Sequence, residues 1–220
     1  MHSLITQHIS AKALSNRVDG KPLIIGITGQ DASGKTHLGR ELVDQLKESG
    51  IDSVLIQVDD FHRTRAERYD PTMSEPQAYL NRSFDFEKLV SKILDPLSRN
   101  SHIDTTLWHL DLATDSHIKE HRYVIQPTSV VVVEGVLLLR PDVRKYLDFT
   151  VYVHADRESI LDRAYIRDVP EQGDDVMRKY DTKYMPAQRE HLDMNTQHIH
   201  SNMIVDNSRW QDARQLPLYS

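Results

Sequence analysis

The sequence contains no cysteine and no long apolar segment. The absence of cysteine from all 220 residues excludes disulfide bonds, a thiol nucleophile and a cysteine-ligated zinc site. The most apolar stretch, residues 130–139, is interrupted by Glu134 and is far shorter than the roughly 20 residues that span a bilayer. The first residues do not join a basic segment to an apolar one, as a secretory signal does. We therefore expect a cytoplasmic protein with no membrane partner.

Basic residues are in the minority, since 27 Lys and Arg face 33 Asp and Glu and the formal net charge is -6. A protein that binds nucleic acid through its phosphates is usually basic, so we expect no nucleic-acid partner. The length suits one domain with a single core. We expect a short helix in residues 1–20 and one domain over residues 21–220, and we leave a homo-oligomer open.

Strands and helices alternate along the chain. Residues 23–28 form a continuous apolar run rich in β-branched side chains, which is typical of a strand buried on both faces. A helical pattern ending at Gly50 and a second strand at residues 54–58 complete a βαβ unit. Further elements are predicted as strands at residues 130–133, 149–153 and 203–205 and as helices at residues 85–94, ending before Pro96, and about 156–167. The sequence therefore predicts an α/β protein with a doubly wound parallel sheet.

Three segments have weaker patterns. Residues 61–82 are polar and predict either a long functional loop or a pair of short helices. Residues 105–123 have no clean period, so we assign them no structure, and residues 168–200 show weak helical spacing. His198 and His200 alternate as two metal ligands on a strand would, but no third ligand accompanies them. We expect both to be surface histidines.

The clearest motif is Gly29-Gln30-Asp31-Ala32-Ser33-Gly34-Lys35-Thr36, which matches the phosphate-binding pattern G-x-x-x-x-G-K-[ST] of P-loops. Glycines let backbone N–H groups turn towards phosphate oxygens, and the following helix adds the positive end of its dipole. The lysine reaches the β- and γ-phosphates, and the threonine hydroxyl can ligate Mg²⁺. We expect the nucleotide to contact Gly29, Asp31, Ala32, Ser33, Gly34, Lys35, Thr36 and His37.

Two predicted strands end in carboxylates. In a doubly wound sheet, ligands bind beyond the carboxyl ends of the strands. Glu134 follows the strand at residues 130–133, where it can hold or orient Mg²⁺. Asp59 follows the strand at residues 54–58, where it can accept a proton from an acceptor hydroxyl. Asp60 competes with Asp59 for that role, because side chains alternate in direction along a strand.

With these motifs the chain resembles the uridine kinase and phosphoribulokinase group of P-loop kinases, from about Leu23 to Asn207. The family carries Asp-Ser-Phe-Tyr after the second strand, and its first Asp, the catalytic base, corresponds to Asp59 in Asp59-Asp60-Phe61-His62. Its Phe-Glu-Gly corresponds to Val133-Glu134-Gly135, and its lid to Arg163-Ala164-Tyr165-Ile166-Arg167-Asp168. The resemblance implies a sheet flanked by helices, a mobile lid around residues 163–190, and phosphoryl transfer from ATP to a small-molecule hydroxyl.

The chain departs from the family pattern at the lid and at the acceptor segment. The family's lid reads Arg-Arg-x-x-Arg-Asp; here Ala164 replaces the second arginine, and Arg167 keeps the third. Gln172 and Asp174 stand where basic residues flank the lid glycine. The family's Asn-Phe-Asp-His-Pro segment, which binds uridine, has no counterpart, and Asp85 matches only the Phe-Asp downstream of it. The identity of the acceptor therefore stays open.

Four arginines gather around the expected acceptor site: Arg63, Arg65, Arg68 and Arg82. They could bind an anionic acceptor through bidentate contacts. Alternatively, they belong to a solvated loop in which Glu67 and Asp70 are their partners, which is the interpretation we favour.

Taken together, the residues predict a kinase that uses ATP and Mg²⁺ to phosphorylate a small hydroxyl compound, with uridine or cytidine as the leading acceptor. Asp59, Lys35 and Arg167 are the expected catalytic residues, and Thr36 and Glu134 the expected metal ligands. The alternatives are another acceptor (pantothenate, a riboside vitamin or a sugar phosphate) or a catalytically silent nucleotide-binding regulator. A GTPase switch would need an Asn-Lys-x-Asp motif, which the sequence lacks.

Overall fold

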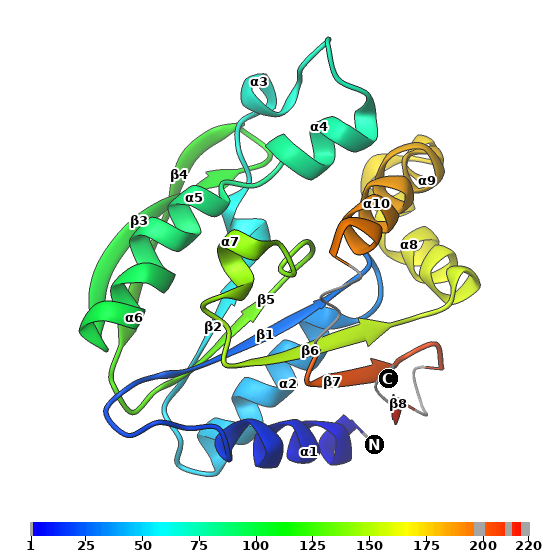
Figure 1. Cartoon of the computed structure of the whole chain (residues 1–220). Coiled ribbons are helices and arrows are strands. Elements are labelled where there is room, and N and C mark those ends of the chain that lie inside the picture. The colour runs from blue at the N-terminus through cyan, green and yellow to red at the C-terminus, as the bar shows by residue number, and fades with distance from the viewer. Residues whose placement is uncertain (1, 196–200, 210–212, 217–220) are drawn as a thin grey trace.

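The computed structural model describes residues 2–195, 201–209 and 213–216. A central sheet carries helices on both faces, and a separate two-stranded hairpin lies along one side of the molecule (Figure 1). His198 and His200 lie outside the described residues. Within the described part of the chain, no helix is long and apolar enough to cross a membrane.

The central sheet has the strand order β2-β5-β1-β6-β7-β8. Its first five members are parallel, and β8 pairs antiparallel with β7 at the edge. The strands are β1 (Leu23–Gly29), β2 (Ser53–Gln57), β5 (Val130–Glu134), β6 (Phe149–His154), β7 (Met203–Asp206) and β8 (Arg214–Leu216). The predicted doubly wound α/β fold is confirmed, and β8 is an addition that the sequence pattern did not predict.

The middle strands are buried on both faces, because each face carries its own apolar core. Ile25 of β1 packs on one side with Leu42 and Ile9, which belong to α2 (Lys35–Glu48) and α1 (His2–Leu14). Ile24 points to the other side and packs in a cluster with Leu89. This two-sided burial explains why β1 reads as an unbroken apolar run.

Two short helices, α3 (Arg65–Arg68) and α4 (Glu75–Arg82), occupy the polar segment after β2. Of the two alternatives that the sequence left open, the pair of short helices is therefore the correct one. The next helix is longer than predicted. It runs through α5 (Phe86–Leu89), a π-helical turn (Val90–Leu94) and α6 (Asp95–Asn100), and so continues past Pro96. Pro96 is tolerated because the wide π turn precedes it, with the Asp95 N–H bonded to the Val90 carbonyl.

The segment without a predicted structure forms the hairpin, made of β3 (Ile103–Asp111) and β4 (Ser116–Ile125). Most of β4 is exposed, and the register shifts between His109 and Leu110. An exposed strand needs no apolar alternation, and a shift in register interrupts the period of two. The hairpin therefore left no clear pattern in the sequence.

The polar region after β6 is helical, as its weak spacing indicated. It contains α8 (Arg157–Gln172), α9 (Asp175–Lys179), a π-helical turn (Tyr180–Tyr184) and α10 (Met185–Asn195), while a short α7 (Pro141–Arg144) follows β5. Helix α8 ends later than the predicted Arg167 and includes Pro170 in its last turn. Pro170 has no N–H to donate to the carbonyl four residues earlier, and the helix ends two residues later, at Gln172.

Two glycines of β1 give a test of this packing. A Cβ on Gly29, which has a φ of 150°, would collide with the backbone carbonyl of Val153. A Cβ on Gly26 would meet only the mobile end of Leu147, at 2.6 Å from its Cδ1. We expect Gly29→Ala to lower the free energy of unfolding by about 3 kcal/mol or more, and Gly26→Ala by about 1 kcal/mol. Urea denaturation of both variants checks this, and equal losses would contradict it.

Candidate active site

The phosphate-loop motif joins the end of β1 to the start of α2. Ala32 and Gly34 have positive φ values of 57° and 98°, so the loop turns sharply before α2 begins at Lys35. Left-handed residues between ordinary ones aim consecutive N–H groups into one concave space. The loop can therefore hold an anion at the N-terminus of a helix 14 residues long.

Lys35 lies across the mouth of this loop. Its side chain is buried, and its Nζ donates a hydrogen bond to the carbonyl oxygen of Gln30 at 2.7 Å. The contact spans the loop from one end to the other. The ammonium group is thus held where a phosphate bound by the loop would meet it.

A cavity of about 580 Å³ opens in front of the loop, a size within the usual range for ligand sites. It is lined by Asp31, Ala32, Gly34, Lys35, Thr36, His37, Arg40, Asp59, Glu134, Gly135, Val136, Arg163, Ile166 and Arg167. All three residues expected to be catalytic and both expected metal ligands are in this set. Of the other expected contacts, Gly29 packs against β6 behind the loop and Ser33 is fully buried.

Sequence reasoning missed several residues of the lining, although a helical period marks some of them. Arg40 lies one turn further along α2 from Thr36 and shares its side of the helix. Ile166 is 75% exposed and lies between Arg163 and Arg167 on the same side of α8. The spacing of Arg163, Ile166 and Arg167, at i, i+3 and i+4 of one helix, was the signal in the sequence that could have placed Ile166 beside the two arginines.

Glu134 is buried at the carboxyl end of β5 and accepts a hydrogen bond from Gln57 Nε2 at 2.8 Å. Burial raises the pKa of this carboxyl group; the charge of Lys35 and hydrogen bonds from Gln57 and Thr36 oppose the rise. Thr36 and Glu134 thus lie side by side, as two oxygen donors for one cation would.

Asp59 and Asp60 lie in a 3₁₀ turn, Val58–Phe61, that continues from β2. Asp59 opens into the cavity. Desolvation by the cavity walls raises the pKa of Asp59, and the charge of Asp31 adds to this, while His62 and Lys35 lower it. Asp60 instead lies near the hairpin, where burial raises the pKa of Tyr123 and the charge of Asp60 raises it further. The turn therefore separates the two candidate bases.

Asp31 ties the phosphate loop to two helices. Its carboxylate accepts hydrogen bonds from the Tyr79 hydroxyl of α4 at 3.0 Å and from Gln188 Nε2 of α10 at 2.5 Å. The Asp31 N–H donates back to Gln188 Oε1 at 3.0 Å. Tyr79 and Gln188 are both buried, so these contacts fix the loop from the side opposite α2.

The two arginines of α8 make different contacts. Arg163 Nη2 donates to the carbonyl of Asn207 at 2.6 Å and so joins α8 to the end of β7. Arg167 Nε donates to Asp168 at 2.6 Å, and its Nη2 to the Tyr180 hydroxyl at 3.0 Å. Asp168 thereby presents Arg167 to the cavity, and the pair accounts for the raised pKa of Arg167.

Three of the four arginines around the expected acceptor site face carboxylates. Arg63, Arg68 and Arg82 lie 3.5, 3.9 and 3.0 Å from Asp85, Asp115 and Asp70. Glu67 instead closes the capping box of α3 with Thr64. The expected pairing with local carboxylates is confirmed for Arg82 and Asp70, and the other two partners come from α5 and the hairpin.

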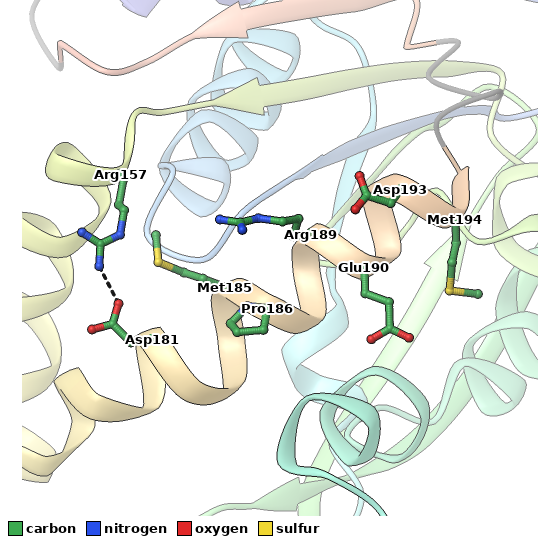
Figure 2. Close-up of a pocket in the computed structure, with 8 residues that line it drawn as sticks. All are labelled: Arg157, Asp181, Met185, Pro186, Arg189, Glu190, Asp193 and Met194. Carbon is green, nitrogen blue, oxygen red and sulfur yellow. Dashed lines mark hydrogen bonds and ion pairs between the residues drawn. The ribbon is translucent and has the colours of Figure 1, made fainter.

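A second hollow of about 740 Å³ lies against α10 (Figure 2). Figure 2 shows its lining: Arg157, Asp181, Met185, Pro186, Arg189, Glu190, Asp193 and Met194. Arg157 Nη2 donates to Asp181 at 2.6 Å across it. It contains none of the residues expected from the sequence, and its charges of both signs give no preference for a charged ligand.

The chain is similar to kinases. The family model described as "Phosphoribulokinase / Uridine kinase family" matches residues 24–208. The uridine kinase of Leuconostoc citreum is 35% identical over 159 residues, which cover 70% of this chain and 71% of the relative. The uridine kinase of Clostridium tetani is 30% identical over 169 residues, covering 73% and 76%. A solved structure described as a possible uridine kinase from Bacillus stearothermophilus shares the fold, with a TM-score of 0.72, 22% identity and coverage of 93% and 99%.

The buried charge of Glu134 gives a prediction about stability. Because its pKa is raised in the folded protein, the folded state holds this proton more tightly than the unfolded state does. The charge therefore destabilises the fold at neutral pH, and its cost disappears as the pH falls to the unfolded pKa. We expect Glu134→Gln, which keeps an oxygen for Gln57, to stabilise the protein by about 1 kcal/mol at pH 7 and less at pH 4. Denaturant unfolding at both pH values checks this; a gain that grew at low pH would contradict it.

Proposed function

Because the chain belongs to the phosphoribulokinase and uridine kinase family, and is thus a phosphotransferase acting on a hydroxyl group, we propose that it transfers the γ-phosphoryl group of ATP to a small uncharged acceptor, with a nucleoside such as uridine or cytidine as the first candidate. One observation carries the proposal. Lys35, Thr36, Glu134, Arg167 and Asp59, which come from four separate segments, line the same cavity.

The nucleotide phosphates fit the loop at residues 29–36. Lys35 and Arg167 contribute positive charge on two sides of the cavity, where charge develops on the transferred group. The bond from Lys35 to the Gln30 carbonyl is one that a phosphate oxygen would replace. His37, Arg40 and Ile166 lie further out along the lining and are the candidates for contact with the rest of the nucleotide.

Mg²⁺ fits the pair formed by Thr36 and Glu134. Among the described residues, no three side chains of the His, Cys, Asp or Glu type gather as a metal site. Mg²⁺ usually keeps several waters and binds through one or two protein oxygens plus substrate phosphates, so this pair is sufficient. The ion would neutralise charge on the phosphates, while Gln57 keeps the Glu134 carboxylate oriented.

Asp59 is the proposed base. Asp59 lines the cavity, where its carboxylate is accessible to a ligand although the surrounding walls desolvate it. An acceptor hydroxyl would approach the γ-phosphate there. The raised pKa of Asp59, due mainly to desolvation, makes the carboxylate a better proton acceptor than a solvated aspartate. The carboxylate can therefore orient the hydroxyl and take its proton during transfer.

The charge around the acceptor site favours an uncharged acceptor. Arg63, Arg68 and Arg82 each lie within 4 Å of a carboxylate, so an anionic acceptor would have to displace those partners. The similar proteins named uridine kinase act on a neutral nucleoside, in agreement with this. Asp85, the residue nearest in sequence pattern to the family's acceptor segment, instead caps α5 and lies near Arg63. Recognition of a nucleoside by this chain would therefore use other contacts than those of that segment.

A panel of acceptors with MgATP tests the proposal. We expect uridine or cytidine to be phosphorylated, and pantothenate and pentose phosphates to react at least about 10-fold more slowly, the cost of one displaced ion pair. Formation of the phosphorylated product, followed by mass spectrometry, is the readout, with Lys35→Ala as a folded control that loses turnover. A preference for the anionic acceptors would overturn the assignment of acceptor class. Failure to phosphorylate any acceptor, with ATP bound normally, would favour a nucleotide-binding regulator.

Asp59→Asn tests the base. The amide keeps the shape of the side chain and a hydrogen-bond acceptor but removes the basicity. We expect kcat to fall by roughly 10²–10⁴-fold, as is usual for a positioned base, while the Kd for MgATP, measured by calorimetry, stays within about 3-fold because the phosphates are bound by the loop.

Asp60→Asn is the matched control. Asp60 is adjacent in sequence but lies towards the hairpin, so its substitution should change kcat far less. If Asp60→Asn were the crippling change and Asp59→Asn were mild, the base would be misassigned by one residue.

A further inference from the structure

We propose that His109, a buried histidine of the β3–β4 hairpin, is a positioning residue that holds the 3₁₀ turn carrying Asp59, with the Tyr123 hydroxyl fixing the histidine tautomer. The proposal rests on the proposed function, because it assigns to His109 the placement of the proposed base. It concerns two residues that the sequence patterns did not single out, on an element that they did not predict.

The geometry is a short chain of buried hydrogen bonds. His109 Nδ1 lies 2.8 Å from the carbonyl oxygen of Asp60, and the Tyr123 hydroxyl lies 2.9 Å from His109 Nε2. His109 and Tyr123 are 2% and 1% exposed, so water does not compete for these groups. The Phe61 ring packs edge-on against the imidazole, with the centroids 5.0 Å apart. The hairpin thus binds the turn at Asp60, the residue after Asp59.

The roles of the two nitrogens follow from their partners. A carbonyl oxygen only accepts hydrogen bonds, so Nδ1 must carry the proton. Nε2 of the neutral ring then accepts from the Tyr123 hydroxyl. Burial lowers the pKa of His109, and nearby Lys88 and His121 lower it further, while the Asp60 carbonyl and carboxylate oppose this. The ring is therefore neutral at physiological pH, in the tautomer that the turn requires.

The turn is fixed at three successive carbonyl groups. The Asp59 carbonyl lies 2.8 Å from His62 Nδ1, and the Phe61 carbonyl accepts from the Asp85 N–H at 2.7 Å. Both of these partners follow the turn in the sequence: His62 comes directly after it, and Asp85 precedes α5. His109 supplies the middle contact, and it comes from a different sheet. Without it, the peptide group between Asp60 and Phe61 would lose this contact, and only the Asp60 Cα separates that group from the peptide group that follows Asp59.

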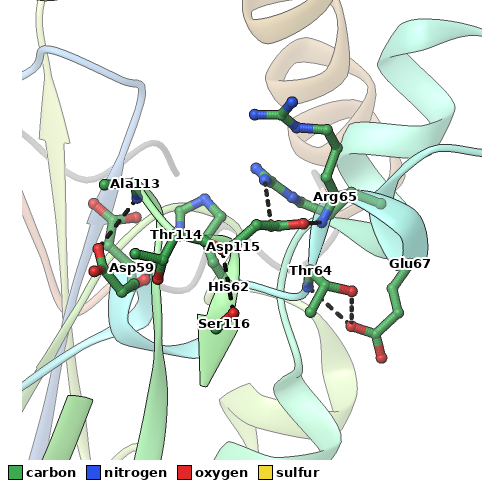
Figure 3. A network of polar contacts seen from close by, with 11 residues as sticks. Asp59, His62, Thr64, Arg65, Glu67, Ala113, Thr114, Asp115 and Ser116 are labelled. Atoms are coloured by element: carbon green, nitrogen blue, oxygen red, sulfur yellow. Dashed lines mark hydrogen bonds and ion pairs between the residues drawn. The ribbon is translucent and has the colours of Figure 1, made fainter. Parts of the chain in front are cut away.

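The hairpin is a firm support because its tip is anchored as well. The Arg65 N–H at the start of α3 is shared between the two carboxylate oxygens of Asp115, at 2.8 and 3.1 Å, and Asp115 also lies 3.9 Å from Arg68. Figure 3 shows this tip beside α3, with Asp59 and His62 in the same view. The hairpin therefore contacts the chain before His62, at Asp60, and after it, at Arg65. These two contacts fix the position of the proposed base relative to α3.

Two isosteric amides separate a positioning role from a merely structural one. In His109→Asn the amide N–H₂ replaces Nδ1 and can still donate to the Asp60 carbonyl. In His109→Gln the amide reaches the place of Nε2, towards Tyr123, and the carbonyl of Asp60 loses its donor. We expect kcat of His109→Gln to fall by at least about 10-fold, because a displacement near 1 Å can cost on the order of 10²-fold, and His109→Asn to stay within about 3-fold. Turnover is measured in two assays: phosphorylation of uridine by MgATP, and hydrolysis of MgATP without uridine.

The controls address stability and nucleotide binding. The Kd for MgATP should be unchanged in both variants, because the phosphate loop does not contact His109. Arg122→Leu removes an exposed ion pair of the hairpin, in which Arg122 Nη2 lies 2.6 Å from Asp104 Oδ2, and it should leave kcat unchanged. Nitrogen-15 NMR of the wild-type imidazole should show the Nδ1–H tautomer, and Tyr123→Phe should increase the other tautomer.

The outcomes distinguish a failure of the role proposed for His109 from a failure of the base proposed at Asp59. Equal kcat values for His109→Asn and His109→Gln, or an Nε2–H tautomer in the wild type, would overturn the role of His109 even if Asp59→Asn is crippled. An unchanged kcat in Asp59→Asn would overturn the assignment of the base itself. A loss of kcat in Arg122→Leu equal to that in His109→Gln would mean that the hairpin matters only through its stability, and this too would overturn the proposal.

Discussion

The site depends on a lysine ammonium group that is held out of water at the edge of the sheet. A buried charge is costly unless its neighbours compensate it. For Lys35 the compensation is the Gln30 carbonyl, together with the nearby carboxylates of Asp59 and Glu134. Burial raises the pKa of both acids, and the lysine charge opposes that rise. The group that would meet phosphate therefore also helps to keep the proposed metal ligand and the proposed base ionised.

The loops of the site are fixed by buried side chains from elements further out. Asp31 in the phosphate loop is held by Tyr79 and Gln188, and the turn after β2 is held by His109. Each contact joins segments that are far apart in the sequence. Loops that must place reacting atoms accurately need such support, because a small displacement at the centre has a large effect on rate.

The sequence predicted structure best in the segments where a local pattern of residues accompanies the functional motif. The strand, loop and helix around Lys35 could be predicted because burial on both faces and the phosphate-binding pattern each leave a local signature. The carboxylates after β2 and β5 followed from parallel topology. The hairpin could not be predicted, because β4 is mostly exposed and its register shifts near His109. The continuation of the helix through Pro96 depends on a π turn with no known sequence signal. The partners of Asp31 are set by tertiary contact alone.

The order of strands in the sheet has a consequence for how the protein is made. β1 is the middle strand, yet its neighbours come much later in the chain, since Leu23 pairs with Val130 and Ile25 with Phe149. During synthesis the apolar β1 is therefore made long before the strands that pair with it. Such non-local pairing is slow, and until it occurs the apolar segment is exposed and prone to aggregate. Gly29 also packs against the Val153 carbonyl. A nascent chain that stopped short of β6 would carry the whole phosphate-binding sequence and still lack the surface against which that loop takes its shape.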